Sequence, residues 1–143
     1  MSVMRTLYVG CALRGAPAEF VASVEALKRE LEQYFEVLHF VGLSPTASAR
    51  EIYKTDIDHA TKADLMLAIA DQPSTGLGME IAKRTELGKP TIIAYHQTKK
   101  ISAMVLGIKQ PFDNVEIIPY ESHEEVLEYM KDLLPRSHVS FRH

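Results

Sequence analysis

The sequence predicts an α/β fold built on one doubly wound parallel sheet of five strands. Strand-like and helix-like segments alternate from end to end. Residues 65–70 are an unbroken apolar run, which is typical of a parallel strand covered on both faces. The composition, 46% apolar and 24% charged residues, is that of a globular protein. Five strands alternating with five helices favour the flavodoxin-like order 2-1-3-4-5, with helices on both faces.

The expected bounds of the helices and strands follow from the spacing of apolar residues and from the positions of glycine and proline. Strands are expected over residues 7–12, 37–41, 65–70, 90–95 and 115–119. Helices are expected over 17–33, 50–62, 101–106 and 122–134, and a loop over 72–78 opens one more helix that ends near Gly88. In the first helix, apolar side chains at steps of four, three and four form one buried stripe. Pro119 places the last strand at a sheet edge.

Length and charge narrow the class of protein. The 143 residues predict one domain over 1–134, followed by a flexible tail over 135–143. The net charge of −3 gives no general attraction to nucleic acid or to an anionic membrane. No apolar run is long enough to span a bilayer, and no signal peptide is evident. Cys11 is the single cysteine, so no intramolecular disulfide is expected, and a cytoplasmic location fits.

The expected strand order places a crevice beyond the carboxyl ends of the first and third strands. We therefore expect the site to combine residues 12–17 with 71–78. The second loop offers the hydroxyls of Ser74 and Thr75, the glycines Gly76 and Gly78, and the N–H groups of a helix start. These groups suit an anion such as phosphate. The alternative is that a hydroxyl caps the helix and the glycines only turn the chain.

Asp56 is an unusual carboxylate for its helix. It shares one stripe with Ile52, Ala60 and Ala63, so it lies on the face that meets the protein. A carboxylate carried into the interior needs either a partner or a function. The alternative is a structural salt bridge.

Glu80 and Tyr8 are the other candidates for chemistry. Glu80 is expected in the first turn of its helix, where the helix dipole favours the ionised carboxylate that a nucleophile at an anomeric carbon needs. The alternative is an exposed Glu80 paired with Lys83 or Arg84. Tyr8, inside the first strand, is a core residue whose hydroxyl needs a partner when buried. Asp71 ends the third strand as a turn residue or as an acceptor for a sugar hydroxyl.

Two further positions complete the candidate set. Arg14, followed by Gly15, leaves the first strand where a guanidinium can meet a phosphate or a base, although a solvated loop arginine is the alternative. Ser102, at another expected helix start, can add a phosphate contact. The six histidines have no zinc-site spacing on one helix face, so no metal is expected.

Several short pieces of the sequence, in order and spacing, resemble the nucleoside 2-deoxyribosyltransferase superfamily. Within it, they are most similar to the 2'-deoxynucleoside 5'-phosphate N-hydrolases. The likeness runs from about residue 6 to 107, and Cys11 departs from it by standing where the family usually has glycine. The matching pieces are residues 7–9 with 13–15, 56–57 with 63–64, 72–74, 76–80, and 102–104 with Gly107.

The resemblance implies roles for the candidate residues. Glu80 would be the nucleophile at the sugar C1', Asp56 the acid/base near the leaving base, and Tyr8 the group that orients Glu80. Substrate binding would fall to Arg14, Gly15, Ser74, Gly76, Gly78 and Ser102. Ser102 would act within its own subunit or across an interface, because the family forms homodimers or larger assemblies. No cofactor is implied.

The leading hypothesis is a hydrolase that cleaves the N-glycosidic bond of (2'-deoxy)nucleoside 5'-monophosphates. Its products are the free base and (deoxy)ribose 5-phosphate. Two alternatives stay open: a nucleoside 2-deoxyribosyltransferase that exchanges bases, and a non-catalytic nucleotide-binding sensor. In every case the expected partner is a small nucleotide, with no nucleic acid and no membrane.

Overall fold

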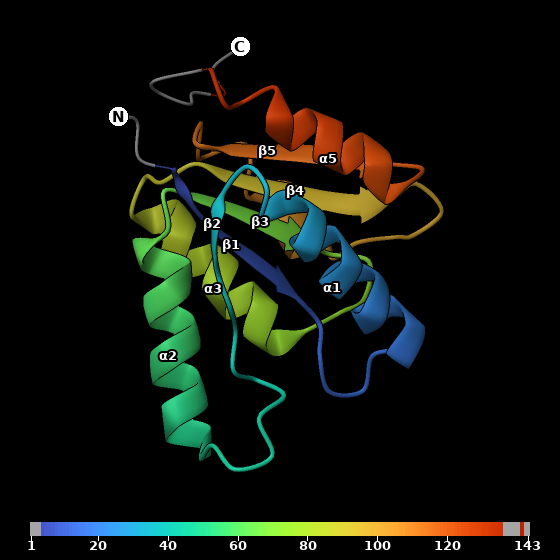
Figure 1. Cartoon of the computed structure of the whole chain (residues 1–143). Helices are drawn as coiled ribbons and strands as arrows, with labels where there is room; N and C mark the ends of the chain where they lie inside the picture. Colours follow the sequence, from blue (N-terminus) through green and yellow to red (C-terminus); the bar gives the residue numbers. More distant parts are fainter. Residues whose placement is uncertain (1–3, 136–140, 142–143) are drawn as a thin grey trace.

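The computed structural model describes residues 4–135 and residue 141, and its centre is an all-parallel sheet. The strand order is β2-β1-β3-β4-β5, as expected (Figure 1). The strands are β1 (Thr6–Cys11), β2 (Glu36–Leu38), β3 (Leu65–Ile69), β4 (Thr91–His96) and β5 (Val115–Tyr120). The predicted fold class is confirmed.

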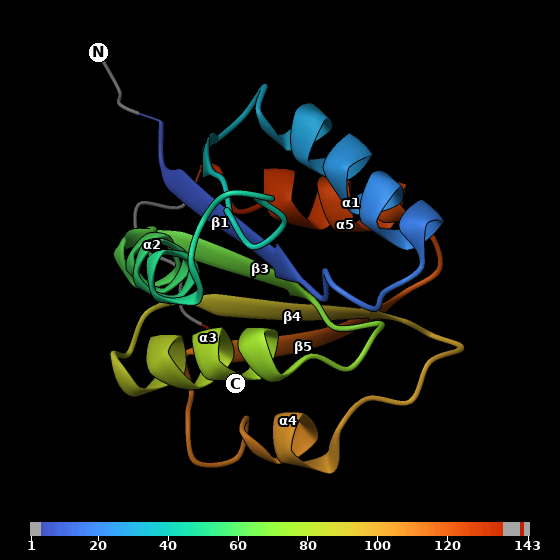
Figure 2. The same ribbon diagram turned by 90° about the horizontal axis from the view of Figure 1, so that it is seen from below.

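Helices cover both faces of the sheet (Figure 2). On one face lie α1 (Ala18–Leu31) and α5 (His123–Lys131), and on the other lie α2 (Ala49–Lys62), α3 (Thr75–Glu86) and the short α4 (Ala103–Gly107). Within the described residues, no helix is both long enough and apolar enough to cross a membrane.

The two-residue period of the central strands decides which side chains meet which helices. Leu7 and Val9 of β1 pack in the cluster that α1 and α5 cover. Tyr8 points to the opposite face and packs there with Met66 and Ala68 of β3. Tyr8 is therefore carried toward α2 and α3, although it lies inside the sheet.

β2 is shorter than the sequence predicts, ending at Leu38 instead of residue 41. Side chains of α2 form hydrogen bonds with backbone groups of residues 39 and 41, which would otherwise extend the pairing of β2 with β1. The ring of His59 donates from Nδ1 to the carbonyl oxygen of His39 at 2.7 Å, and the Val41 N–H donates to Asp56 Oδ1 at 2.7 Å. Tertiary hydrogen bonds have replaced strand pairing here.

α3 begins earlier than expected, at Thr75, so Gly76 and Gly78 are helical residues. The Ser74 hydroxyl caps the helix by accepting the Leu77 N–H at 3.1 Å. Glu80 consequently lies in the second turn, and the prediction that it occupies the first turn is wrong.

The tail expected over 135–143 lies mostly outside the described residues. Pro135 follows α5, and Phe141, the other described residue of this stretch, is 6% exposed and packs with the core cluster of α1 and α5.

Arg84 joins the ends of α2 and α3, and its side chain is fully buried. Its guanidinium donates to the carbonyl oxygens of Ala60, Ala63, Asp64 and Pro90. Burial lowers the pKa of Arg84 to about 10, and the charge of Asp64 opposes this shift. Arg84 thus satisfies carbonyls that the C-terminus of α2 leaves unpaired.

We expect Arg84→Met to destabilise the protein by about 3 kcal/mol or more, because it leaves several buried carbonyls without donors. Urea unfolding followed by circular dichroism measures the change. The matched control is Lys83→Met at the exposed neighbouring position, which should shift the free energy of unfolding by no more than about 0.5 kcal/mol. Equal effects of the two substitutions would contradict this role.

Candidate active site

A cavity of about 500 Å³ opens among the end of β1, the loop that follows β2, and helices α2 and α3. The structure brings six of the sequence-predicted residues to its wall: Tyr8, Arg14, Asp56, Ser74, Gly76 and Glu80. They come from three separate parts of the chain, residues 8–14, residue 56 and residues 74–80. The expected location beside the carboxyl ends of β1 and β3 is therefore where the cavity lies.

The Glu80 carboxylate is held by Tyr8 inside this cavity. The Tyr8 hydroxyl donates to Glu80 Oε2 at 2.5 Å, and Glu80 is 8% exposed. Gly10 makes room for the pair, since a Cβ at this position would lie 3.2 Å from Glu80 Oε1 and 3.2 Å from the Tyr8 ring. The alternative of an ion pair with Arg84 is not what the structure shows, because Arg84 is bound to carbonyls.

Burial dominates the titration of Glu80. It raises the pKa of Glu80 to about 7, the Tyr8 hydrogen bond lowers that pKa, and the charge of Asp56 raises it. Burial and the neighbouring Glu80 raise the pKa of Tyr8, so its hydroxyl keeps its proton as a donor. The expectation that the helix dipole favours an ionised Glu80 is wrong, because Glu80 lies past the first turn and is desolvated.

Asp56 is bound by backbone amides rather than by a salt bridge. It is 8% exposed and accepts hydrogen bonds from the Val41 N–H and the Gly42 N–H. Burial raises the pKa of Asp56, while these amides and the nearby His59 and Lys28 lower it. Residue 42 must be small, since a Cβ there would lie 3.3 Å from Asp56 Oδ2.

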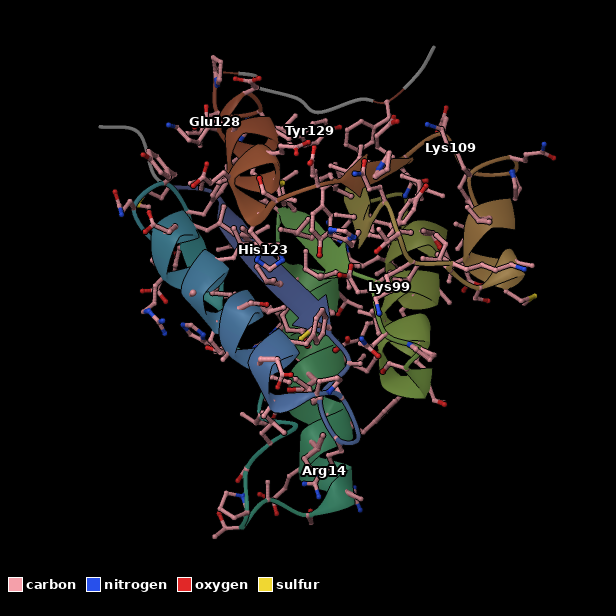
Figure 3. The ribbon with its side chains drawn as sticks, turned by 90° about the vertical axis from the view of Figure 1, so that its right-hand side faces the viewer. Arg14, Lys99, Lys109, His123, Glu128 and Tyr129 are labelled. Carbon is pink, nitrogen blue, oxygen red and sulfur yellow. The ribbon has the colours of Figure 1, made fainter. Side chains whose placement is uncertain are left out.

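Arg14 joins the two loops at the rim of the cavity. Its Nε donates to the Gly42 carbonyl oxygen at 3.1 Å, and one terminal nitrogen donates to the Ser44 carbonyl oxygen at 3.5 Å. The guanidinium lies beside the start of α2 (Figure 3). It is exposed and lines the cavity at the same time.

The start of α3 faces the same cavity through Ser74, Thr75 and Gly76. The Ser74 hydroxyl oxygen already accepts the Leu77 N–H, so its proton is free to be donated outward. The N–H groups of Thr75 and Gly76 belong to the first turn, which has no carbonyl partner within the helix. This arrangement suits an anion.

The remaining predicted binding residues lie elsewhere. Gly78 and Ser102 line an adjoining cavity of about 630 Å³ between α3 and α4, and Ser74 borders both cavities. The Ser102 hydroxyl caps α4 by accepting the Met104 N–H at 3.2 Å. Gly15 has a positive φ of 83°, as a turn requires, and is not part of either wall.

Asp71 has a different role from the ones expected. Its Oδ1 accepts the His96 N–H at 2.9 Å, and its Oδ2 accepts the Tyr120 hydroxyl at 2.6 Å. The carboxylate therefore connects the ends of β3, β4 and β5.

Sequence reasoning missed two residues of the apolar wall of the cavity, Tyr53 and Phe40. Three apolar residues of α2 line the cavity beside Asp56. Ile52 precedes Asp56 by four residues, Tyr53 precedes it by three, and Ile57 follows it directly. The predicted stripe already placed Ile52 beside Asp56, and the same helical spacing could also have identified Tyr53. Phe40 also lines the wall, and no local pattern marks it. The described residues contain no group of histidine, cysteine or acidic side chains that could hold a metal ion.

Comparisons with known proteins bear on this arrangement. No model of a known protein family matches the chain. A curated relative from Thermofilum pendens, named a candidate 2'-deoxynucleoside 5'-phosphate N-hydrolase, is 28% identical over 140 residues, which cover 92% of this chain and 96% of the relative. A relative of the same name from Nematostella vectensis is 30% identical over 116 residues, which cover 73% of this chain and 78% of the relative.

Solved structures share the fold. A CMP N-glycosidase from Clostridium botulinum superposes with a TM-score of 0.69 at 22% identity, covering 89% of this chain and 98% of the other. A 2-deoxyribosyltransferase from Bacillus psychrosaccharolyticus gives a TM-score of 0.62 at 19% identity, covering 87% and 91%. By its sequence relatives, the chain belongs to the 2'-deoxynucleoside 5'-phosphate N-hydrolase family, and it shares its fold with a 2-deoxyribosyltransferase.

Proposed function

We propose that the protein is an N-glycosidase that hydrolyses (2'-deoxy)nucleoside 5'-monophosphates to the free base and (deoxy)ribose 5-phosphate. The observation that carries this proposal is the buried Tyr8–Glu80 pair, which shares one cavity with Asp56 and with the start of α3. The names of the curated relatives support the same reaction.

The reaction needs two carboxyl groups with opposite tasks. Breaking the N-glycosidic bond builds positive charge on the sugar and negative charge on the base. Glu80 attacks C1' and forms a glycosyl ester, while the electron pair of the C1'–N bond leaves with the base, which takes a proton from Asp56. Asp56 then removes a proton from water, the water oxygen attacks C1', and Glu80 is released as a carboxylate.

The protonation states are compatible with these tasks. With a pKa of about 7, a substantial fraction of Glu80 is ionised at neutral pH. The Tyr8 hydroxyl stabilises that anion and fixes the carboxylate plane. Burial raises the pKa of Asp56, which favours a carboxyl group able to donate a proton.

A 5'-phosphate fits the start of α3. The Ser74 hydroxyl and the N–H groups of Thr75 and Gly76 would hold the phosphate. These contacts are remote from the bond that breaks, and they orient C1' toward Glu80. Gly78 and Ser102 extend this region through the adjoining cavity, and Ser102 contributes from the same copy or from a neighbouring one in a homodimer or larger assembly. Arg14 completes the rim at the opposite loop.

Replacing the nucleophile should stop turnover without unfolding the protein. We expect Glu80→Gln to lower the rate of base release at least about 1000-fold, because the amide cannot form the glycosyl ester. Chromatography of free base from a panel of ribo- and deoxyribonucleotides measures the rate. The control is Glu86→Gln, an exposed position on the same helix, which should retain full activity. A fully active Glu80→Gln protein would end the proposal.

A substitution at Ser74 tests whether the start of α3 binds the 5'-phosphate. Aspartate is also a good helix cap, so Ser74→Asp should keep α3 intact while its charge repels the phosphate. We expect kcat/KM for monophosphates to fall about 100-fold or more, with the turnover of unphosphorylated nucleosides unchanged. Ser74→Thr keeps both the cap and the hydroxyl and should stay close to the original activity. Equal rates on nucleosides and monophosphates, with transfer to an added base, would instead assign a base-exchanging transferase.

The raised pKa of Glu80 also predicts how stability depends on pH. Between the ordinary value of 4.5 and about 7, the folded protein binds more protons than the unfolded chain, so stability should fall as pH rises through this interval. Glu80→Gln removes the free-energy cost of ionising a buried carboxyl group. At pH 8 this variant should be more stable than the original protein by about 3 kcal/mol. Urea unfolding at pH 4 and pH 8 measures the difference, which should vanish at the lower pH. A difference independent of pH would contradict a buried ionised Glu80.

A further inference from the structure

Lys28 is a buried cation that the proposed chemistry leaves unused. It lies on α1 and is 2% exposed. Its ammonium pairs with Glu25 Oε1 at 3.2 Å and lies 4.0 Å from the centroid of the Phe40 ring. Because the Glu25 side chain is 37% exposed, water screens its charge more strongly than it screens the buried ammonium, so part of the field of Lys28 remains.

The Phe40 ring separates this cation from the cavity. Phe40 lines the cavity wall, whereas Lys28 does not. The ammonium lies over the ring, and the same side chain borders the cavity. A planar base placed there would stack on a ring that a cation already polarises from behind.

Phe40 is also next to the proposed proton donor. The following residue, Val41, gives its N–H to Asp56 Oδ1 at 2.7 Å. Because Asp56 must reach the departing base, the ring and the cation behind it lie at the base end of the cavity rather than at the phosphate end.

We propose that Lys28 is a positioning residue for base departure, acting through the Phe40 ring to favour the negative charge that develops on the leaving base. This inference rests on the proposed function of the cavity. The charge on the base is small in the bound substrate and large in the transition state, so the interaction raises kcat more than it strengthens binding. No further bond is made or broken by Lys28.

The field of Lys28 reaches other groups around the same site. It lowers the pKa of Asp56 and of the Cys11 thiol, although burial dominates and raises the Cys11 pKa to about 12. His59 acts on Asp56 in the same direction. Lys28 is thus electrostatically coupled to residues of β1 and α2 as well as to Phe40.

The chain offers a matched control on its surface. Lys131 also lies over an aromatic ring, 5.0 Å from the centroid of Tyr34, and pairs with Glu128 three residues earlier. This pair repeats the Lys28 arrangement away from the cavity. Lys131→Met therefore controls for the loss of a cation–π contact and an ion pair.

The first experiment compares Lys28→Met with Lys131→Met on two monophosphates whose bases differ in acidity. For the less acidic leaving base we expect kcat to fall roughly tenfold in Lys28→Met with little change in KM, and for the more acidic base we expect a smaller loss. Lys28→Arg should restore most of the rate, and Lys131→Met should match the original protein. Lys28→Gln replaces the Met variant where the latter does not fold.

The second experiment needs no substrate. Titration of the Asp56 carboxyl carbon by NMR should give a higher pKa in Lys28→Met than in Lys131→Met or the original protein. If the original protein releases base normally, and Lys28→Met matches Lys131→Met both in kcat and in the pKa of Asp56, this inference is overturned while the proposed function stands. If the original protein releases no base from any monophosphate, the proposed function falls and this inference falls with it.

Discussion

The hydrogen bond between Tyr8 and the buried Glu80 carboxylate is the constraint on which the rest of the site depends. Burying a carboxylate costs free energy, and the hydrogen bond from Tyr8 reduces that cost without removing it. The alternation of β1 turns Tyr8 toward α3, and the missing side chain of Gly10 lets ring and carboxylate approach the sheet. The raised pKa of Glu80 is the part of the cost that remains.

The relative placement of the two carboxyl groups has its own structural basis. Arg84 lies one helical turn after Glu80, and Ala60 lies one turn after Asp56. The hydrogen bond from Arg84 to the Ala60 carbonyl oxygen therefore joins the turns adjacent to those that carry the acidic groups. Arg84, which does not line the cavity, in this way fixes the position of α2 relative to α3 and with it the relative position of Asp56 and Glu80.

Local patterns in the sequence were sufficient for the strand order and for the inward direction of Asp56, because both depend on hydrophobic period. They were not sufficient for the end of β2 or the start of α3, where a hydrogen bond to Asp56 and the Ser74 cap decide the boundary. The partners of Phe40 and Lys28 lie on different elements, and only the folded chain brings them together. The pKa of Glu80 was misjudged because burial cannot be read from helix position alone.

The loop between β2 and α2 is attached to the site through its main chain. The anchors are the N–H groups of Val41 and Gly42 and the carbonyl oxygens of Gly42 and Ser44, bound by Asp56 and Arg14. Side chains such as Val41 and the exposed Leu43 contribute none of these anchors. Substitutions at positions 41 and 43 can therefore change the side chains of this loop without removing a hydrogen bond that holds Asp56 or Arg14.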